Sequence, residues 1–463
     1  METLQRTANR GSVSTSYDVD NSLKFEPDNS EYLKWTNIST YATSARKKTF
    51  SFSVWFKISE LGVQRTIWST AANGYLLLQA DGELKWQQSY NSSVKVLQTN
   101  RVLRDTSAWY NVIVAVDTTQ STEANRQRIY INGVEETSFS TSTYPSQNDE
   151  ADNVYESFHS LGAYNASSIF WSGYMCDVAF ISDAQITPSD VGEFDSGSGI
   201  WKPKSYSGGS APSYFLEFKD SSDLGSATGL DADTLNNITA ADQSTDTCTN
   251  NFCTLNPLVN FKYTTNGITE GATEFGDNTG GGVGGAFGTF AVTKGKWYWE
   301  VKLTQQNAHY IGISAVDDGE NVFAATDPQD ENSSFIFNIS VARIEYVNSG
   351  TKSYGSADAF TDFHSAGDII GIALNMDDNQ ISIYGNGTLQ SGVANTTLYD
   401  AANKMVVPFH GTINDECQYN FGGYSVWTPS SAASDANGYG TFEYAPPSGY
   451  YALCTKNLAQ YGG

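Results

Sequence analysis

A single hairpin near residue 375 constrains the fold of this chain more than any other stretch. Residues 369–376 (Ile-Ile-Gly-Ile-Ala-Leu-Asn-Met) are too few for a typical helix and almost entirely apolar, which favours a strand buried on both faces. Residues 377–380 (Asp-Asp-Asn-Gln) have turn chemistry, and in residues 381–384 Ile alternates with Ser and Tyr, the period of a half-buried strand. The Asn-Gly pair at 386–387 supplies a second tight turn. This stretch therefore predicts antiparallel β-structure.

The sequence on either side of this hairpin resembles the SPRY domain. The resemblance rests on Gly-Lys-Trp-Tyr-Trp-Glu-Val at 295–301, Tyr-Ile-Gly at 310–312, Pro408 in Val-Val-Pro-Phe, Asn-Phe-Gly-Gly at 420–423 and Phe-Glu-Tyr-Ala-Pro-Pro-Ser-Gly-Tyr at 442–450. It covers residues 257–463 and implies a concanavalin A-like β-sandwich used for recognition. Gly385 and Asn375 stand where the family often has Lys and Asp, so the resemblance implies no particular partner.

The first half of the chain has the same β-rich character. Asp81-Gly82 and Asn132-Gly133 have the composition of tight hairpin turns. Strand patterns occupy residues 49–58, 74–79, 84–86, 109–116, 128–135 and 170–180. This set and its order resemble a laminin-G-like, or concanavalin A-like, jelly roll over residues 21–198. We therefore predict an all-β protein with two tandem concanavalin A-like jelly-roll β-sandwiches.

Composition suggests where the domains begin and end. Residues 1–20 are polar and lack periodicity, and we expect them to form an N-terminal assembly or anchoring segment. Residues 199–256 include an acidic stretch rich in Ser, Thr, Asp and Asn, which predicts a polar linker or an extended arm rather than a core. The predicted domains are therefore a laminin-G-like sandwich at 21–198 and a SPRY-like sandwich at 257–463.

Charge and cysteine content exclude several classes of protein. The formal net charge is −25, and no basic patch is evident, so we expect no nucleic-acid partner. No apolar run suits a secretory signal or a membrane span, so we expect a protein made in cytoplasm without membrane insertion. The five cysteines are scattered and predict free thiols, and no spacing between cysteines and histidines indicates zinc.

The concanavalin A-like fold also hosts retaining glycosidases, which need two carboxylates on one strand face. Their motif, Glu-x-Asp-x-x-Glu, is carried by none of the strands predicted here. Glu193 and Asp195 have its first spacing but lie in a Gly/Ser/Asp loop, and Glu300 is a lone carboxylate in a strand pattern. We therefore expect no catalytic residues and no enzyme activity; a polysaccharide depolymerase remains the enzymatic alternative.

Loop residues supply the candidates for binding. Aromatic rings can stack on sugars and amides can bond their hydroxyls, so we single out Tyr90, Asn91, Tyr144 and Tyr354. Clustered carboxylates suit calcium, the one cofactor that the sequence suggests. The candidate calcium ligands are Asp149, Glu150 and Asp152 in one loop, and Asp317, Asp318 and Glu320 in another. Each group has an alternative reading as an ordinary solvated loop.

The domain order suggests a biological setting. A short polar N-terminus, a laminin-G-like sandwich, an acidic junction and a SPRY-like sandwich together resemble virion proteins of marine bacteriophages. That resemblance implies a tail fibre or appendage, located on the virion, that attaches to a host-surface glycan or protein. It also implies contacts with other virion proteins through the N-terminal segment and a homo-oligomer, expected to be a trimer. The alternative is a capsid-decorating or other structural component.

Overall fold

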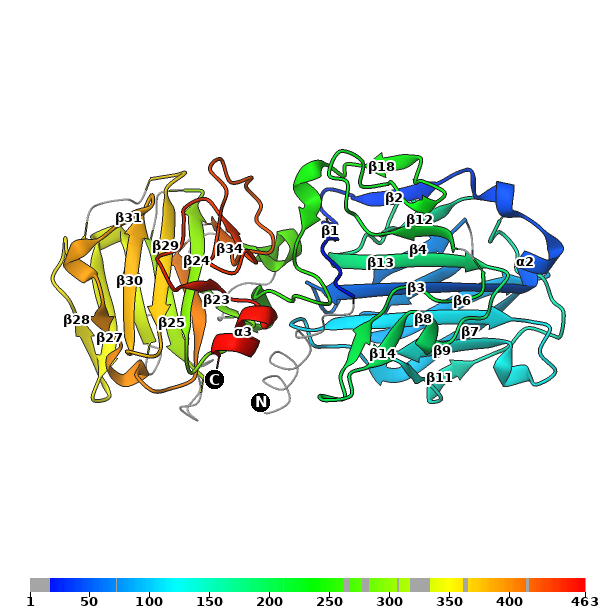
Figure 1. Ribbon diagram of the computed structural model, residues 1–463, viewed down its shortest axis with the longest axis horizontal. Coiled ribbons are helices and arrows are strands. Elements are labelled where there is room, and N and C mark those ends of the chain that lie inside the picture. Colours follow the sequence, from blue (N-terminus) through cyan, green and yellow to red (C-terminus); the bar gives the residue numbers. More distant parts are fainter. Residues whose placement is uncertain are drawn as a thin grey trace. The chain divides into compact units, whose positions relative to one another are not determined.

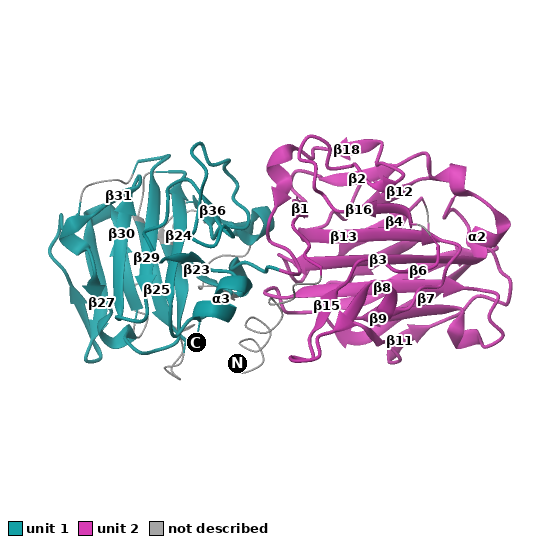
Figure 2. Ribbon diagram, viewed as in Figure 1, with its two compact units in different colours: residues 1–13, 250–463 teal, residues 14–249 magenta. Residues whose placement is uncertain are grey.

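The protein is described by a computed structural model of residues 17–462, except residues 72, 156, 211, 261–266, 277–282, 306–307, 317–333, 361–364 and 414–415. It divides into two compact units, coloured separately in Figure 2. Unit 2 comprises residues 14–249, and unit 1 comprises residues 250–463 together with residues 1–13. Most of the predicted N-terminal segment, residues 1–16, lies outside the described part of the chain.

Unit 2 is a sandwich of two antiparallel sheets (Figure 1). Its strands are β1 (Ser22–Phe25), β2 (Tyr32–Trp35), β3 (Thr49–Ile58), β4 (Arg65–Thr70), β5 (Tyr75–Leu78), β6 (Glu83–Tyr90), β7 (Ser93–Val102), β8 (Trp109–Asp117), β9 (Gln127–Ile131), β10 (Val134–Glu135), β11 (Phe139–Ser142), β12 (His159–Leu161), β13 (Gly173–Ser182), β14 (Gly192–Phe194), β15 (Trp201–Pro203), β16 (Pro212–Leu216), β17 (Thr228–Gly229), β18 (Thr234–Asn236) and β19 (Gln243–Ser244). Its short helices are η1 (Ile38–Tyr41), α2 (Ser44–Lys48), η2 (Glu123–Asn125), η3 (Pro188–Asp190) and η4 (Ala240–Asp242).

Strand order defines the two layers of unit 2. The nine-stranded sheet runs β10-β9-β8-β3-β13-β1-β19, with β16 beside β13 and β17 beside β16. The eight-stranded sheet runs β11-β7-β6-β5-β4-β12-β2-β18. Along β3, alternate residues such as Phe50, Phe52 and Val54 enter the core between the sheets, where they meet Trp68 and Trp86 of the facing sheet. The predicted jelly-roll sandwich is confirmed.

The stretch predicted as a linker is instead part of this sandwich. Ser244 in β19 pairs with Ser22 in β1, and Thr249 Oγ1 accepts a hydrogen bond from the Val19 backbone N–H at 3.0 Å. Strand β18 pairs with β2 in the other sheet. The linker prediction is therefore wrong for most of residues 199–256. Polar edge strands in this stretch, β18 and β19, pair through their backbones with one sheet each, and composition does not reveal such pairing. The two ends of unit 2 consequently meet at one sheet edge.

Unit 1 is a second sandwich (Figure 1). Its strands are β20 (Leu255–Asn260), β21 (Ile268–Thr269), β22 (Glu274–Gly276), β23 (Val283–Gly288), β24 (Lys296–Leu303), β25 (Ala308–Ala315), β26 (Ser334–Asn338), β27 (Arg343–Asn348), β28 (Thr351–Tyr354), β29 (Ile369–Asn375), β30 (Gln380–Gly385), β31 (Thr388–Leu389), β32 (Thr396–Thr397), β33 (Val406–Ile413), β34 (Glu416–Asn420), β35 (Ala433–Ser434), β36 (Thr441–Phe442) and β37 (Tyr451–Ala452). Its helices are η5 (Glu270–Ala272), η7 (Ile339–Val341), η8 (Ser391–Val393), η9 (Tyr399–Ala401) and α3 (Thr455–Tyr461). No helix in the described ranges is long and apolar enough to cross a membrane.

The hairpin predicted at residues 369–387 forms strands β29 and β30 of unit 1. One sheet runs β20-β23-β33-β25-β26-β27-β28 and the other runs β21-β22-β34-β24-β29-β30-β31. Strand β29 is buried throughout and pairs with β24 on one side and β30 on the other. Asn386 and Gly387 adopt positive φ angles of 47° and 79°, as a tight turn of this composition requires. The prediction for this stretch is confirmed.

Candidate functional site

The outer face of the eight-stranded sheet in unit 2 carries a cluster of polar aromatic and amide side chains. Tyr75 and Gln87 face each other across β5 and β6, and the Tyr75 hydroxyl donates a 2.5 Å hydrogen bond to Gln87 Oε1. The ring of Tyr164 meets that of Tyr75 edge-on at 5.6 Å, and Lys85 Nζ lies 5.7 Å from the Tyr75 ring centre. We call these four residues the Tyr75 cluster. Its members present ring edges, an amide and a cation, the groups that bind polar ligands.

The Tyr75 cluster sits where the strand period places it. Leu76 and Leu84, the alternate residues on the same two strands, point into the core between the sheets. Tyr75 is 9% exposed and forms the floor, while Lys85, Gln87 and Tyr164 are half-buried. Burial raises the pKa of Tyr75 to about 12. Its hydroxyl is therefore protonated at neutral pH and acts as a hydrogen-bond donor to Gln87.

The outer face of the nine-stranded sheet, in contrast, is covered by its own chain. Ile113 and Ile181 on that face pack against Ile186 and Val191, which follow β13. Trp201 in β15 lies over the β9–β10 turn and donates a hydrogen bond to Asn111 Oδ1 at 3.1 Å. Ile186, Val191 and Trp201 thus shield part of this outer face, which leaves the Tyr75 face as the better candidate for a ligand.

Two predicted candidates, Asn91 and the 149–152 loop, come together at the end of the same strands. Asn91 Nδ2 donates to Asp149 Oδ1 at 2.9 Å, and its backbone N–H donates to the Glu150 carbonyl. Asp152 Oδ2 accepts hydrogen bonds of 2.7 Å from the Ser89 hydroxyl and the Ser92 N–H. Because Ser89 follows Gln87 on the outer face of β6, this loop borders the Tyr75 cluster.

The predicted calcium ligands Asp149, Glu150 and Asp152 do not converge on one point. Asp149 accepts a hydrogen bond from the Asn91 amide and Asp152 accepts one from the Ser92 N–H, both in the β6–β7 turn, and Glu150 bonds the Ser44 hydroxyl instead. Their ligand atoms are not gathered at one point; among the described residues, that occurs for only one group of three such side chains, which lies in unit 1. Asp317, Asp318 and Glu320 lie outside the described residues.

Of two aromatic candidates, Tyr90 departs from its predicted loop position and Tyr144 keeps it. Tyr90 was expected in an exposed loop, but it ends β6 with no exposed surface, and its hydroxyl lies 3.3 Å from Gln127 Oε1. That prediction is wrong, because the 149–152 loop folds over the strand end and Ala151 bridges Tyr90. Tyr144 is half-buried against the core. The Tyr90 ring therefore offers no free face for stacking, whereas Tyr144 keeps part of its surface exposed.

Tyr354 is exposed, but it lies in a strand rather than a loop. It ends β28, the edge strand of its sheet, and is 51% exposed. The Arg343 guanidinium lies 4.6 Å from its ring centre and Lys352 Nζ lies 5.5 Å away. Cations thus already occupy the vicinity of this ring, which makes it a weaker stacking surface than its exposure suggests.

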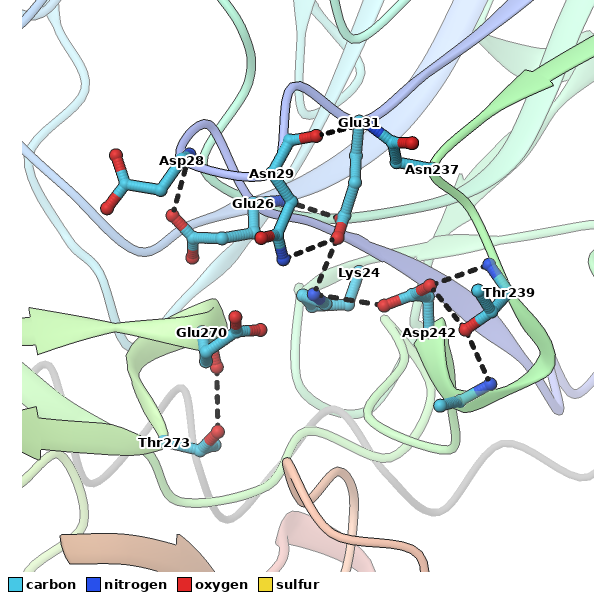
Figure 3. Close-up of polar contacts among 11 residues, drawn as sticks. Lys24, Glu26, Asp28, Asn29, Glu31, Asn237, Thr239, Asp242, Glu270 and Thr273 are labelled. Atoms are coloured by element: carbon cyan, nitrogen blue, oxygen red, sulfur yellow. Dashed lines mark hydrogen bonds and ion pairs between the residues drawn. The ribbon is translucent and has the colours of Figure 1, made fainter.

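The glycosidase spacing Glu-x-Asp-x-x-Glu does occur outside the predicted strands, at Glu26, Asp28 and Glu31 (Figure 3). The structure places it in the turn between β1 and β2, where Asp28 is exposed but Glu26 and Glu31 are each 2% exposed. Glu31 Oε2 accepts a 2.7 Å hydrogen bond from the Glu26 N–H. These carboxylates do not share one strand face, which a retaining pair requires.

A buried lysine holds this turn in place. Lys24 Nζ lies 3.2 Å from Glu31 Oε1 and 3.0 Å from Asp242 Oδ1 (Figure 3). Burial raises the pKa of Glu31 to about 7, although the charge of Lys24 opposes this shift. Asp242 belongs to η4, so the triplet ties the start of unit 2 to the end of it. We assign this cluster to folding rather than to ligand binding.

The other carboxylates considered for catalysis are also held by their own domain. Glu193 and Asp195 both bind Lys202 Nζ, at 3.2 and 3.5 Å, across the β14–β15 hairpin. Glu300 accepts backbone hydrogen bonds from Glu443 at 2.8 Å and Tyr444 at 2.9 Å. Glu300 therefore anchors the C-terminal segment to β24.

Comparison with known families defines two regions of the chain. The model for the concanavalin A-like lectin/glucanases superfamily matches residues 27–192, and the SPRY domain model matches residues 296–424. The chain thus carries a laminin-G-type concanavalin A-like domain and a SPRY domain, as the residues that resemble these families suggested. No curated protein sequence matches the chain.

Solved structures show distant similarity. The SPRY domain of human HERC1 is 16% identical, with 32% of this chain and 87% of that chain covered and a TM-score of 0.24. Domains LG4-5 of the mouse laminin alpha1 chain are 10% identical, with 88% and 90% covered and a TM-score of 0.30. A Bacteroides ovatus protein described as carbohydrate binding is 14% identical, with 47% and 62% covered and a TM-score of 0.28. These similarities are too distant to carry function.

Proposed function

We propose that this chain is a non-catalytic attachment protein that binds a surface glycan through the outer face of the eight-stranded sheet. The observation that carries the proposal is the Tyr75 cluster, which joins aromatic edges, an amide and a lysine on one half-buried face. Sugars present both apolar ring faces and many hydroxyls, and such a mixed face matches both features. The match of residues 27–192 to a superfamily that includes lectins supports the same function.

Within this proposal, Gln87 and Tyr164 are the specificity residues. Gln87 Oε1 accepts the Tyr75 proton, which directs the Gln87 amide N–H groups toward an acceptor on the ligand. Tyr164 is half-buried and supplies a ring that packs edge-on against Tyr75, the partner of that amide. Asn91 and Asp152 at the adjoining loops extend the same surface to a second sugar residue.

The architecture supports a more specific setting, a bacteriophage virion. We propose that the protein is a tail fibre or appendage, that its N-terminal segment binds other virion proteins, and that it forms a homo-oligomer. The receptor would then be a host-surface glycan, bound without catalytic turnover and without a required metal. The support is the combination of a laminin-G-type domain and a SPRY domain in one chain.

The experiment is a glycan array followed by calorimetry on the full chain, with Gln87→Ala and Tyr164→Ala as test variants. We expect saturable binding by the wild-type protein and a loss of affinity of about five- to thirtyfold in either variant, because a lost hydrogen bond or stacking contact accounts for about 1–2 kcal/mol. Tyr206→Ala is the matched control, since Tyr206 is half-buried on the opposite, covered face. Equal binding by all variants would rule out this face.

A second measurement addresses the virion setting. Antibodies against the protein should label the tail of phage particles in electron micrographs and should block adsorption to host cells. Label on the capsid would favour the decorating component instead. Release of oligosaccharide from host polysaccharide would show a depolymerase and contradict the non-catalytic function.

A further inference from the structure

Three potential metal ligands converge in the core of unit 1. They are His309 in β25, His410 in β33 and Cys417 in β34, and all three are 0% exposed. One ligand atom from each lies within 4.8 Å of the other two. Two imidazoles and a thiol so close together form a polar group inside an otherwise apolar core, where Phe275 packs edge-on against His410 at 5.5 Å.

Strand register explains how these residues meet. In the β25–β33 ladder His309 pairs with Thr412 and His410 pairs with Ile311, so the two histidines are diagonal neighbours on one face of the sheet. Their ring centres lie 5.6 Å apart. Cys417 comes from the facing sheet, in which β34 pairs with β24 and β22. The group thus bridges the two sheets, and no sequence spacing reveals it.

The separations approach those of a coordination site. Cys417 Sγ lies 3.4 Å from His410 Nε2 and 3.5 Å from His410 Nδ1. Nitrogen and sulfur ligands around one tetrahedral zinc ion lie roughly 3.3–3.6 Å apart, given metal–ligand bonds of about 2.0–2.3 Å. Since Sγ is almost equally far from both ring nitrogens, rotation of the His410 ring can direct either nitrogen at an ion. A separation of 4.8 Å, the upper limit within the group, would shorten by roughly 1.2–1.5 Å on binding.

We propose that His309, His410 and Cys417 bind one thiophilic transition-metal ion, Zn(II) or Cu(I), that cross-links the two sheets of unit 1. Imidazole and thiolate are the ligands that both ions prefer. On binding, the Cys417 thiol transfers its proton to solvent and its sulfur bonds the metal, which gives a neutral centre with Cu(I) and a singly positive one with Zn(II). Because a buried net charge is unfavourable, the three-ligand set favours Cu(I) over Zn(II).

A buried histidine of unit 2, His159, provides a comparison, because hydrogen bonds to its own domain account for its position. His159 in unit 2 is also 0% exposed, but its Nε2 lies 2.7 Å from the Val154 carbonyl and its Nδ1 lies 3.2 Å from the Tyr214 hydroxyl. Its ring thus bonds a hydroxyl and a backbone carbonyl. At His410 the atom within hydrogen-bonding reach is a thiol sulfur, and a second imidazole adjoins it.

The test is metal loading of the full-length protein. Purified protein is loaded under anaerobic conditions with Zn(II), with Cu(I), or with Co(II) as a spectroscopic substitute for zinc, and bound metal is measured by mass spectrometry. We expect one equivalent per chain and a sulfur-to-cobalt charge-transfer band, with Cu(I) displacing Zn(II) in competition. Wild-type protein that binds no stoichiometric metal, or Co(II) protein without a thiolate band, would overturn the proposal whether or not any variant folds.

Two cysteine variants then assign the ligand. Cys417→Ser should abolish the band and weaken binding at least tenfold. Cys454→Ser is the matched control, because Cys454 is also 0% exposed and lies in unit 1 outside the group. Unchanged binding by Cys417→Ser, or an equal loss in Cys454→Ser, would contradict the assignment. The result is independent of glycan binding, which concerns residues of unit 2.

Discussion

Lys57 Nζ lies 2.7 Å from Asp246 Oδ2, and both side chains are only 1% exposed. Trp109 Nε1 donates a further hydrogen bond to the other carboxylate oxygen of Asp246 at 3.1 Å. Asp246 belongs to the acidic stretch that composition assigned to a linker, so a buried ion pair joins that stretch to the central strand β3. Removal of one partner from a buried ion pair strongly destabilises the folded protein, because the other charge stays buried without its counter-ion.

The first prediction concerns this ion pair. Asp246→Asn leaves the Lys57 charge buried without its counter-ion, and we expect a loss of about 3–5 kcal/mol in the free energy of unfolding. The measurement is urea denaturation, with hydrogen exchange of unit 2 peptides to assign the transition. Lys219→Ala is the control, because the Lys219–Glu217 pair has a lysine side chain that is 60% exposed and should contribute at most about 1 kcal/mol. Similar losses in both variants would contradict the prediction.

The second prediction concerns pH and Glu300. Burial raises the pKa of Glu300 from 4.5 to about 7, which outweighs the hydrogen bonds from the Tyr444 and Glu443 backbones. A raised carboxyl pKa means that the folded state binds the proton more tightly than the unfolded state. Its contribution to stability is therefore fully present below about pH 4.5 and is lost as pH rises through about 7.

Unit 1 should consequently be more stable at pH 5 than at pH 8, by on the order of 2 kcal/mol from Glu300 alone. Glu300→Gln removes the titration and should flatten this part of the profile, measured by denaturation at several pH values. Asp358→Asn, at an exposed carboxylate of unit 1, is the control variant and should retain the wild-type profile. A wild-type slope of opposite sign between pH 5 and 8 would contradict the assignment.

The third prediction concerns the Asn132-Gly133 turn. Gly133 has a φ of +77°, and a Cβ atom there would lie 2.3 Å from Trp201 Cε3. Gly133→Ala therefore adds a steric clash to the backbone strain, and we expect a lower melting temperature than for Gly62→Ala. Gly62 has a φ of +81° with no atom near its would-be Cβ, so it measures the strain alone, about 1 kcal/mol. Equal melting temperatures for the two variants would show that Trp201 moves aside.

The fourth prediction concerns the thiols of unit 2. Cys176 Sγ and Cys248 Sγ lie 3.5 Å apart, close enough to form a disulfide when an added oxidant such as diamide accepts their two hydrogens. Burial raises the pKa of both thiols, so cross-linking should be slow at pH 7 and faster at pH 9. Peptide mass mapping should find this bond in wild-type protein and lose it in Cys248→Ser. A bond from Cys176 to any other cysteine would contradict the geometry.

Local sequence patterns predicted the strands and turns of the fold well, but they did not predict which distant strands pair with each other. Asn132-Gly133 and Asn386-Gly387 fix their own backbone angles, and both occur as tight turns. Ser244 and Asp246, in contrast, look like residues of a solvated linker and become buried only because β19 completes a sheet edge formed more than two hundred residues earlier. Composition describes side chains and says nothing of edge pairing.

The candidate site was predicted in part for the same reason. Asn91 and the 149–152 loop were found because their residue types suit ligand binding, and the structure brings them together. Tyr75 and Gln87 were not found, since a Tyr in a Leu-rich strand looks like a core residue until the sheet shows which face it occupies. His309, His410 and Cys417 meet only through register and sheet stacking.

The meeting of both ends of unit 2 at the β1–β19 edge has a mechanical consequence. Residues Val19 and Thr249 lie at the same end of an antiparallel pair, so tension applied through the chain at these points pulls the two strands apart from one end. The hydrogen bonds then break one after another rather than all together in shear. The rest of the sandwich carries no load until β1 and β19 have separated, so this edge is the first part of unit 2 to yield under tension.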